Sequence, residues 1–377
     1  MTNRIGLYLH IPFCHTRCDF CAFYLELYRT AAADSFIRSI KREIRLRSSH
    51  EEISGYSFES VYFGGGTPTS LPAEKLVELL ADIRCSFCLT PDCEISVEAH
   101  PGTVSLQDLK RLALAGFNRI SFGAESMRDD ELVRIGRPAF ARDTVRAVNQ
   151  ARDAGFTNIN FDLMYGLPGQ SLQSYSETLQ QILDLEPFHI SCYALTVEPG
   201  TKLAHDIEHC RRDPPDDTIQ IFMDRRARMM LAQAGYQQYE ISNYARPGYA
   251  CRHNLLYWTD GDYLGLGPSA QSYVRGVRFG NVANLTAYHT ALAQEQLPIQ
   301  DLTTLSEEER LRDAVIFGLR LFQGVTTQQL NEHAANYGHT AVLEELRGGL
   351  LIEEEGGWSR LSEQGRLQAD TVAQKLY

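Results

Sequence analysis

The feature that most constrains this fold is a regular alternation of short apolar segments with longer helical segments over the first 235 residues. We expect strands at residues 5–10, 60–63, 94–98, 119–122, 159–164 and 189–194. We expect helices at residues 32–47, 73–83, 106–114, 142–154, 172–183 and 217–234. This alternation is typical of βα units, which build a parallel sheet. Six units fall short of the eight of a complete barrel, so the sequence predicts an α/β protein with a partial, six-unit TIM-like barrel.

The pattern changes after residue 235. Residues 236–273 are rich in Gly, Tyr and Asn and show little helical periodicity, whereas helical patterning returns from Ser306. Near the end, residues 350–353 and 358–361 are expected to pair across two glycines as a hairpin that follows helices, which is the layout of a winged helix. We therefore predict three parts, a barrel at 1–235, a connecting region at 236–300 and a winged-helix-like α+β domain at 301–377.

The charge of the chain argues against nucleic acid as a partner. Its formal net charge is −12, so broad attraction to nucleic acid or to an anionic membrane is not expected. The expected C-terminal hairpin carries Glu353, Glu354 and Glu355, which weighs against DNA binding there.

The lengths of the apolar runs and the number of cysteines indicate where in the cell the protein is located. No apolar run approaches the roughly 20 residues of a membrane span, and the N-terminal segment lacks the apolar core of a signal peptide. Nine scattered cysteines, an odd number, suit a reducing environment, where clustered thiols are more often metal ligands than disulfides. We therefore expect a cytoplasmic protein without a transmembrane segment.

Cys14, Cys18 and Cys21 follow the first expected strand in a C-x3-C-x2-C spacing. Structural zinc needs four ligands, and His10 or His15 could be the fourth. A [4Fe–4S] cluster held by three cysteines instead leaves one iron open to a substrate or cofactor. The short aromatic loop at the mouth of a barrel favours the cluster. A second thiol set has no evident fourth ligand, and free or packed thiols are favoured for it: Cys85, Cys88 and Cys93.

Polar or glycine residues lie at the ends of all the other expected strands. In chain order they are Gly64, Gly65 and Gly66, then Glu98, Glu125, Asp162, and Tyr193 with Ala194. In a parallel barrel these positions open onto one face, where such folds place active sites. Three consecutive glycines let a ligand approach the backbone closely, although a tight turn is the alternative. The run is not a P-loop, because no Gly-Lys-Ser/Thr follows it.

Seven motifs resemble those of one known family. They are YLHIPFCHTRCDFC, YFGGGTPTSL, ISVEAHP, GFNRISFGAES, RIGR, FDLMYGLPGQ and CRHNLLYW. Together they are similar to the oxygen-independent coproporphyrinogen-oxidase-like branch of the radical S-adenosylmethionine (SAM) proteins, over nearly the whole chain. Within that branch, EISNYARPGYACRHNLLYW and GDYLGLGPSA most resemble the HemW type of heme chaperone.

The resemblance implies cofactors and a site. The open iron of a [4Fe–4S] cluster would chelate SAM, and one-electron reduction by a donor such as flavodoxin or ferredoxin would cleave SAM to methionine and a 5′-deoxyadenosyl radical. By motif match, the residues implied to contact this SAM are Tyr8, Gly65, Gly66, Thr67 and Glu98. Those implied to line an adjacent or second SAM site are Phe20, Glu125, Arg137, Asp162 and Ala194.

Three positions depart from the family pattern. Glu125 stands in GAES where the family usually reads GVQS, so a carboxylate replaces an amide. Gln271 stands in GPSAQS where HemW-type sequences read GPGAHS. Ala22 and Phe23 follow Cys21 where the oxidase carries a fourth cysteine, so coproporphyrinogen oxidase activity is not expected.

The HNLLYW motif is where we expect heme contact. Neutral imidazole suits iron, which makes His253 the candidate ligand, with Cys251 as a second possible axial ligand. The alternative for His253 is a hydrogen-bonded histidine that packs against Tyr257 and Trp258.

The leading hypothesis is therefore a HemW-like protein that binds a cluster, SAM and heme and delivers heme to an acceptor that the sequence does not identify. The alternative is a HemN-like radical SAM enzyme, such as a C-methyltransferase, which Glu125 and Gln271 favour. A zinc-stabilised barrel without a redox role is the third.

Overall fold

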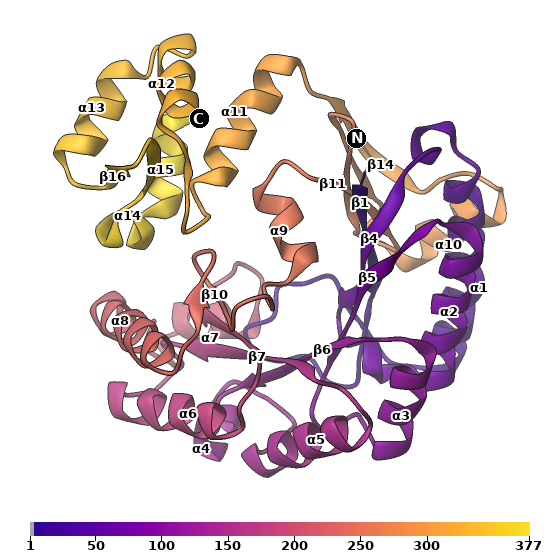
Figure 1. Ribbon diagram of the computed structural model, residues 1–377. Helices are drawn as coiled ribbons and strands as arrows, with labels where there is room; N and C mark the ends of the chain where they lie inside the picture. The colour runs from indigo at the N-terminus through magenta and orange to yellow at the C-terminus, as the bar shows by residue number, and fades with distance from the viewer. Residues whose placement is uncertain (1–3) are drawn as a thin grey trace.

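The computed structural model describes residues 4–377, apart from the side chain of residue 52. All six expected strands are present and pair side by side in parallel in chain order. They are β1 (Arg4–Ile11), β4 (Ser57–Gly65), β5 (Leu89–Ala99), β6 (Arg119–Glu125), β7 (Asn158–Tyr165) and β8 (His189–Ala194). Figure 1 shows the sheet curving without closing, which confirms the partial α/β barrel.

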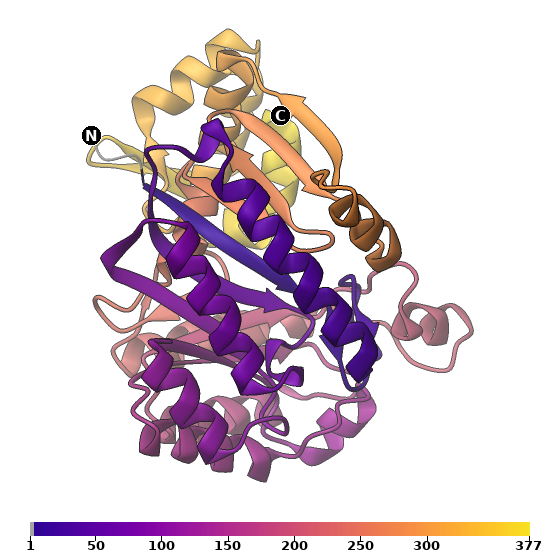
Figure 2. The same ribbon diagram turned by 90° about the vertical axis from the view of Figure 1, so that its right-hand side faces the viewer.

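The six expected helices are also present and cover the outer face of the sheet (Figures 1 and 2). They are α1 (Thr30–Ser48), α2 (Ala73–Ser86), α3 (Leu106–Ala115), α5 (Ala141–Asp153), α6 (Leu172–Asp184) and α8 (Asp217–Gln233). Ser105 begins α3 with a capping box, and Gly116 ends it in the left-handed region. Two further helices, α4 (Asp129–Arg134) and α7 (Lys202–Glu208), escaped the sequence reading because they are too short to show a helical period.

Residues 237–304 extend the sheet at both of its edges. First, β9 (Gln237–Gln238) and β10 (Asn243–Ala245) continue antiparallel from β8. The chain then crosses to the other edge through α9 (Arg252–Trp258), and β11 (Asp262–Leu266) pairs in parallel with β1. Three antiparallel strands and one helix follow: β12 (Gln271–Val274), β13 (Val277–Asn281), α10 (Leu285–Ala293) and β14 (Ile299–Thr304).

Helix α9 packs directly on the backbone of β1, and one glycine permits this contact. A Cβ atom on Gly6 would lie 2.4 Å from Leu256 Cδ1 and 2.9 Å from His253 Nδ1. The crossing segment therefore lies against the barrel strands. Leu264, Phe279 and Tyr288 from the residues that follow α9 belong to the same apolar core as the barrel.

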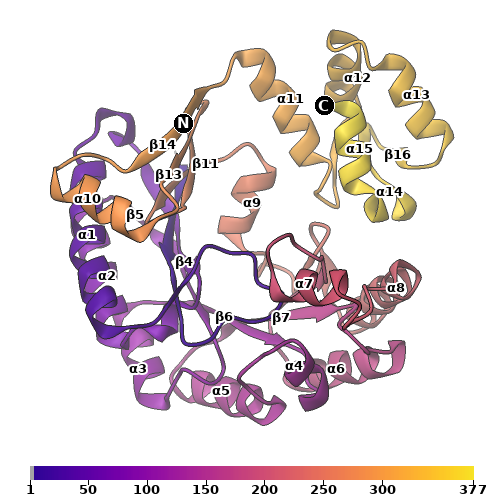
Figure 3. The ribbon, with the colours of Figure 1, turned by 180° about the vertical axis from the view of Figure 1, so that it is seen from behind.

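The C-terminal residues form a separate layer with its own apolar core (Figure 3). The elements are α11 (Glu307–Gly318), β15 (Val325–Thr326), α12 (Thr327–Asn336), α13 (Thr340–Gly348), β16 (Ile352–Glu355), β17 (Trp358–Leu361), α14 (Glu363–Leu367) and α15 (Ala369–Leu376). The expected hairpin is present, with its first strand two residues later than expected. Glu353 and Glu355 pair with Arg360 across the hairpin, and Glu354 pairs with Arg347.

The division of the chain at residues 235 and 300 stays a prediction, since the barrel core includes residues on both sides of 235. Among the described helices, none is both long enough and apolar enough to cross a membrane.

Candidate cluster and cofactor site

A short loop after β1 carries the three clustered cysteines. Its two ends pair as β2 (Phe13–Cys14) and β3 (Glu26–Leu27), which are parallel. The Glu26 amide donates to the Pro12 carbonyl at 2.6 Å, and the Tyr28 amide donates to the Cys14 carbonyl at 2.9 Å. This clasp holds the loop closed at the carboxyl end of the barrel strands, which is the position expected from the sequence.

The three thiols lie close enough to influence one another. Burial raises the pKa of Cys14 and of Cys21, and the charge of Cys18 raises both further. Arg137 Nη1 donates to Cys18 Sγ at 3.5 Å, and Cys14 Sγ lies 3.3 Å from Thr67 Oγ1. Thiols in this state bind a metal as thiolates when a positive centre compensates their charge.

The spacing of the three sulfurs separates the two metal alternatives. A single tetrahedral ion with Zn–S bonds of about 2.3 Å holds its sulfurs about 3.8 Å apart. Within residues 4–377, the three cysteine sulfurs do not form a set with all members inside 4.8 Å of one another. The wider spacing suits ligands on different corners of a multi-iron cluster.

The two histidines considered as a fourth zinc ligand are placed for other contacts. His10 Nδ1 lies 3.2 Å from the Tyr8 hydroxyl, and His10 Nε2 lies 3.1 Å from the Tyr24 carbonyl oxygen. His15 is exposed, and its ring packs edge-on against Tyr28. These contacts weigh against the zinc alternative.

The glycine run lies directly against the cysteine loop. Gly65 has a φ of 112°, and a Cβ there would lie 2.8 Å from the His10 ring. A Cβ on Gly66 would lie 2.8 Å from the Phe13 carbonyl oxygen. The amides of Gly65, Gly66 and Thr67 donate to Glu98, Ile11 and Phe13 respectively, so they are used inside the protein. Glycines are therefore required here because neighbouring atoms leave no room for a Cβ. A ligand would contact the side of this turn that faces away from His10 and Phe13.

Two carboxylates, Glu98 on β5 and Asp162 on β7, project into the barrel from either side of β6. Glu98 accepts from the Tyr62 hydroxyl at 2.9 Å and from the Gly65 amide at 3.2 Å. Burial, with the nearby charge of Asp162, raises the pKa of Glu98 to about 8. Asp162 accepts from Ser121 at 2.7 Å and from Asn160 at 2.9 Å. The barrel interior is therefore polar and can hold a ligand rich in hydroxyl and amino groups.

A buried ion pair connects the fourth strand to the cysteine loop. Glu125 Oε1 lies 3.3 Å from Arg137 Nη2, and the same guanidinium donates to the Gly123 carbonyl at 2.5 Å and reaches Cys18. Burial raises the pKa of Glu125 to about 7 against the opposing effect of Arg137. Glu125 also has a φ of 61°, which is uncommon for a non-glycine residue. The strained backbone places this carboxylate beside the loop rather than in solvent.

Comparison with known proteins identifies the family. Residues 8–182 match the Radical SAM superfamily. The heme chaperone HemW of Bacillus subtilis is 33% identical over 372 residues, which span 97% of each chain. The heme chaperone HemW of Mycobacterium tuberculosis (strain H37Rv) is 34% identical over 98% of this chain and 94% of its own. The chain belongs to the HemW family of heme chaperones.

A solved structure agrees with this assignment. The coproporphyrinogen III oxidase HemN of Escherichia coli, a radical SAM enzyme, superposes with a TM-score of 0.87 at 26% identity, covering 99% of this chain and 90% of its own. Membership of the HemW family places the chain in the radical SAM superfamily, which implies a [4Fe–4S] cluster and SAM. The donor set fits that cluster, because three thiols share one loop and the two histidines considered for zinc, His10 and His15, make other contacts.

The other residues that the resemblance pointed to lie in different surroundings, most of them near the cysteine-loop end of the barrel. Phe20 packs against a small apolar group formed by residues of β7 and α7 and the segments beside them, which includes Leu203. Tyr193 and Ala194 end β8 with exposed side chains, Tyr193 being 41% exposed. Tyr8 lies deeper, with its ring centre 6.2 Å from those of Tyr62 and His253, which stack 5.3 Å apart. Gln271 lies elsewhere, exposed on the antiparallel edge of the sheet.

The HNLLYW motif forms α9, and its histidine is enclosed. His253 is 2% exposed; its Nδ1 lies 2.9 Å from Ser60 Oγ and its Nε2 lies 2.9 Å from the Tyr257 hydroxyl. Burial lowers the pKa of His253 to about 3, so the ring is neutral. Cys251 is also buried and donates to Glu94 at 3.4 Å. Of the two alternatives for His253, these contacts favour the packed, hydrogen-bonded histidine.

The second thiol set is not gathered into one site. Cys85 and Cys88 are exposed, whereas Cys93 is buried, and all three are free. Burial raises the pKa of Cys93 to about 12. This arrangement agrees with the free or packed thiols favoured from the sequence.

One anchor of the cysteine loop was missed by the sequence analysis. Asp19 Oδ2 accepts from Lys202 at 2.8 Å and from Arg212 at 2.6 Å. The Asp19 amide donates to the Ile135 carbonyl, and its carbonyl accepts from the Leu203 amide. Figure 3 shows α7 beside the loop at the open end of the barrel. The partners lie more than 100 residues away in the chain, so no local signal identifies this anchor.

Proposed function

We propose that this chain holds a [4Fe–4S] cluster on Cys14, Cys18 and Cys21, binds SAM at the open end of the barrel, and binds heme for delivery to an acceptor protein, with the cytoplasm as its location. The observation that most supports a cluster is the cysteine loop. Burial and the neighbouring cysteines raise the pKa of Cys14 and of Cys21, and Arg137 donates to Cys18. When bound, such a cluster supplies an iron atom without a protein ligand and transfers single electrons.

The surrounding residues supply binding and orientation. Glu98, held by Tyr62 and the Gly65 amide, is placed to accept from the hydroxyl or amino groups of SAM. Arg137 neutralises negative charge beside Cys18 and is itself held by Glu125. Phe20, on the same loop, packs against the apolar group that includes Leu203 and Ile135.

Anaerobic reconstitution tests the cluster and SAM together. We expect about four iron atoms per chain and a broad visible absorbance, and we expect SAM binding to require the iron. Glu98→Gln should weaken SAM binding while iron loading stays intact. An iron content near zero, or one zinc ion per chain, would contradict the proposal.

The similarity to heme chaperones supports heme binding by this chain. Two substitutions test whether His253 is the heme ligand. Iron ligation through Nε2 requires that atom to release the Tyr257 hydroxyl. If His253 is the ligand, Tyr257→Phe frees Nε2 and strengthens heme binding, while His253→Ala weakens it and shifts the Soret band. If His253 only packs, Tyr257→Phe leaves the heme affinity unchanged. Heme titration of both variants separates these outcomes, and no Soret band in the unaltered protein would end the heme proposal.

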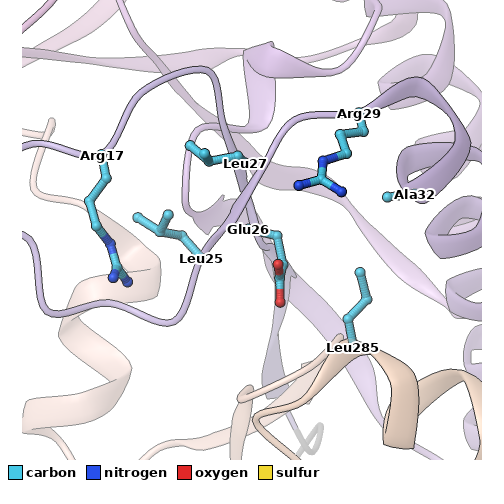
Figure 4. Close-up of a pocket in the computed structure, with 7 residues that line it drawn as sticks. All are labelled: Arg17, Leu25, Glu26, Leu27, Arg29, Ala32 and Leu285. Carbon is cyan, nitrogen blue, oxygen red and sulfur yellow. The ribbon is translucent and has the colours of Figure 1, made fainter.

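An electron donor must reach the cluster, and we propose that it docks on the outer wall of the loop. A surface hollow of about 380 Å³ lies there, and Figure 4 shows Arg17 and Arg29 on opposite sides of it, with Leu25, Glu26 and Leu27 between. Leu27 is 53% exposed and stands in register with Cys14. Within residues 4–377, neither arginine forms an ion pair. Cationic side chains around exposed apolar ones suit an acidic partner such as flavodoxin.

Charge reversal tests the docking surface. Arg29→Glu should weaken flavodoxin binding about 10-fold at low salt, and the loss should shrink as salt is added. Arg42→Glu, an exposed site further along α1, is the matched control and should have no effect. Reduction by dithionite should be unchanged in both variants. Equal losses in the two variants would place the donor elsewhere.

A second candidate function is radical chemistry on a small substrate, such as C-methyl transfer. The observation that favours it is the polar barrel interior around Glu98 and Asp162, whose carboxylates are hydrogen-bonded by Tyr62 and Ser121. Substrate-dependent formation of 5′-deoxyadenosine and S-adenosylhomocysteine would support it, and the absence of both would exclude it.

A further inference from the structure

The end of α7 gathers three metal-ligating side chains that the cofactor site does not use. His205, Glu208 and His209 are all exposed, and one donor atom from each lies within 4.8 Å of the others. The rings of His205 and His209 are 4.1 Å apart, centre to centre. Positions i, i+3 and i+4 share one face of a helix turn, so the clustering follows from the sequence spacing.

The hydrogen bonding of His209 prepares it as a ligand. Its Nδ1 lies 2.8 Å from the His205 carbonyl oxygen, which only accepts, so Nδ1 carries the proton. Nε2 of the neutral ring then bears the free lone pair. Metal-binding histidines are typically held in this way, with the other ring nitrogen donating to a backbone carbonyl.

At His205, an arginine side chain already occupies the ring nitrogen that a metal ion would bind. Arg211 Nη2 lies 3.1 Å from His205 Nε2, and a guanidinium only donates, so this nitrogen also carries a lone pair. Arg211 has a second acceptor in Asp206, at 3.3 Å. A metal ion can therefore displace Arg211 from His205 without leaving the arginine unpaired.

The backbone that carries these side chains is well anchored. Thr201 caps α7 through the Ala204 amide, and the Cys210 and Arg211 amides close its end on Ile207 and Asp206. A surface hollow lined by Lys202, His205 and Glu208 adjoins the three ligands and gives room for water. The ligand positions are therefore set before any ion binds.

We propose that His205, Glu208 and His209 bind a divalent first-row transition ion, with water completing its coordination. Two imidazoles and one carboxylate are a ligand set that zinc, cobalt and nickel accept, and that magnesium and calcium do not favour. This site is independent of the cluster on the cysteine loop and goes beyond the proposed function.

Cobalt is the probe that distinguishes this site from the free thiols. Titration of the cluster-loaded chain with Co²⁺ should show one equivalent bound, with visible d–d bands and no thiolate charge-transfer band. His209→Ala should weaken Co²⁺ binding by at least about 10-fold. His50→Ala, which removes an exposed histidine at the far end of α1, is the matched control and should leave it unchanged.

Arg211→Gln is the decisive variant. Stronger metal binding in this variant is expected only if His205 is a metal ligand. Removing the competing donor should strengthen Co²⁺ binding about 5-fold, since a charge-assisted hydrogen bond no longer has to be broken. Weaker binding in Arg211→Gln, no d–d bands at excess Co²⁺, or binding accompanied by a thiolate band and insensitive to His209→Ala would each overturn the proposal. The three substituted residues are exposed, so we expect the variants to stay folded, and circular dichroism checks this.

Discussion

The cysteine loop and helix α9 both adjoin β1, at different places, and their polar side chains differ in their surroundings. On the loop, burial raises the pKa of the Cys14 and Cys21 thiols, and the charge of Arg137 opposes this at both, joined by Arg17 at Cys21. On α9, each ring nitrogen of His253 has a hydroxyl partner, and Cys251 donates to Glu94. Clustered, buried thiols are suited to bind a metal that takes them as thiolates, whereas the hydrogen-bonded groups of α9 stabilise the fold.

The largest expected effect is on the loop. Cys18→Ser should reduce the iron content from about four atoms per chain to near zero, because two remaining thiolates cannot hold the cluster. The unfolding free energy of the iron-free protein should change by less than about 1 kcal/mol. Iron analysis and urea unfolding measure the two quantities. Cys88→Ser, at an exposed thiol, should change neither, and full iron loading in Cys18→Ser would remove Cys18 from the ligand set.

His253→Ala should have the opposite profile. It leaves a cavity in α9 packing and strips Ser60 and Tyr257 of a partner, so the unfolding free energy should fall by about 3 kcal/mol while iron loading persists. Urea unfolding of the iron-free protein is the measurement. His15→Ala, at an exposed ring, should cost less than about 0.5 kcal/mol. An unaltered unfolding curve for His253→Ala would mean that α9 does not depend on this ring.

Glu98→Gln should change the pH dependence of stability. The folded pKa of about 8 lies above the ordinary 4.5, so between these values the folded chain holds a proton that the unfolded chain has lost. The contribution of Glu98 is therefore present below about pH 4.5 and is lost as pH rises toward 8. Glu98→Gln keeps an acceptor for Tyr62 without the charge, so it should gain about 1 to 2 kcal/mol over the unaltered protein between pH 5 and pH 8. Parallel pH profiles for the two proteins would contradict the assignment.

The smallest effect is expected at Glu125. Glu125→Gln installs the amide that similar sequences carry and removes a buried carboxylate whose pKa is raised to about 7. Arg137 keeps its bonds to the Gly123 carbonyl and to Cys18, so the unfolding free energy at pH 7 should change by less than about 1 kcal/mol. Thermal unfolding of the iron-free protein checks this. A loss above 2 kcal/mol would show that the ion pair, rather than the guanidinium alone, holds the loop.

Local patterns predicted the barrel because each βα unit carries its own signal. The strand at His189–Ala194 was predicted at its exact bounds. The same approach missed α4 and α7, since six or seven residues do not complete two turns. It also missed that the residues after 235 join both edges of the sheet, because strands of two to six residues leave almost no periodic trace.

The candidate site divides in the same way. The spacing of Cys14, Cys18 and Cys21 is local, so the sequence alone indicated a three-thiol loop. The anchor of that loop on Asp19, with Lys202 and Arg212, joins residues more than 180 positions apart and is visible only in three dimensions.

By itself, then, the sequence determined which residues stand at the carboxyl ends of the strands and how the three thiols are spaced, because strand alternation and loop spacing depend on near neighbours in the chain. Only the tertiary structure decided the partners. It set Ser60 against His253 and joined Asp19 to Lys202 and Arg212, because these hydrogen-bond partners depend on which distant segments pack together.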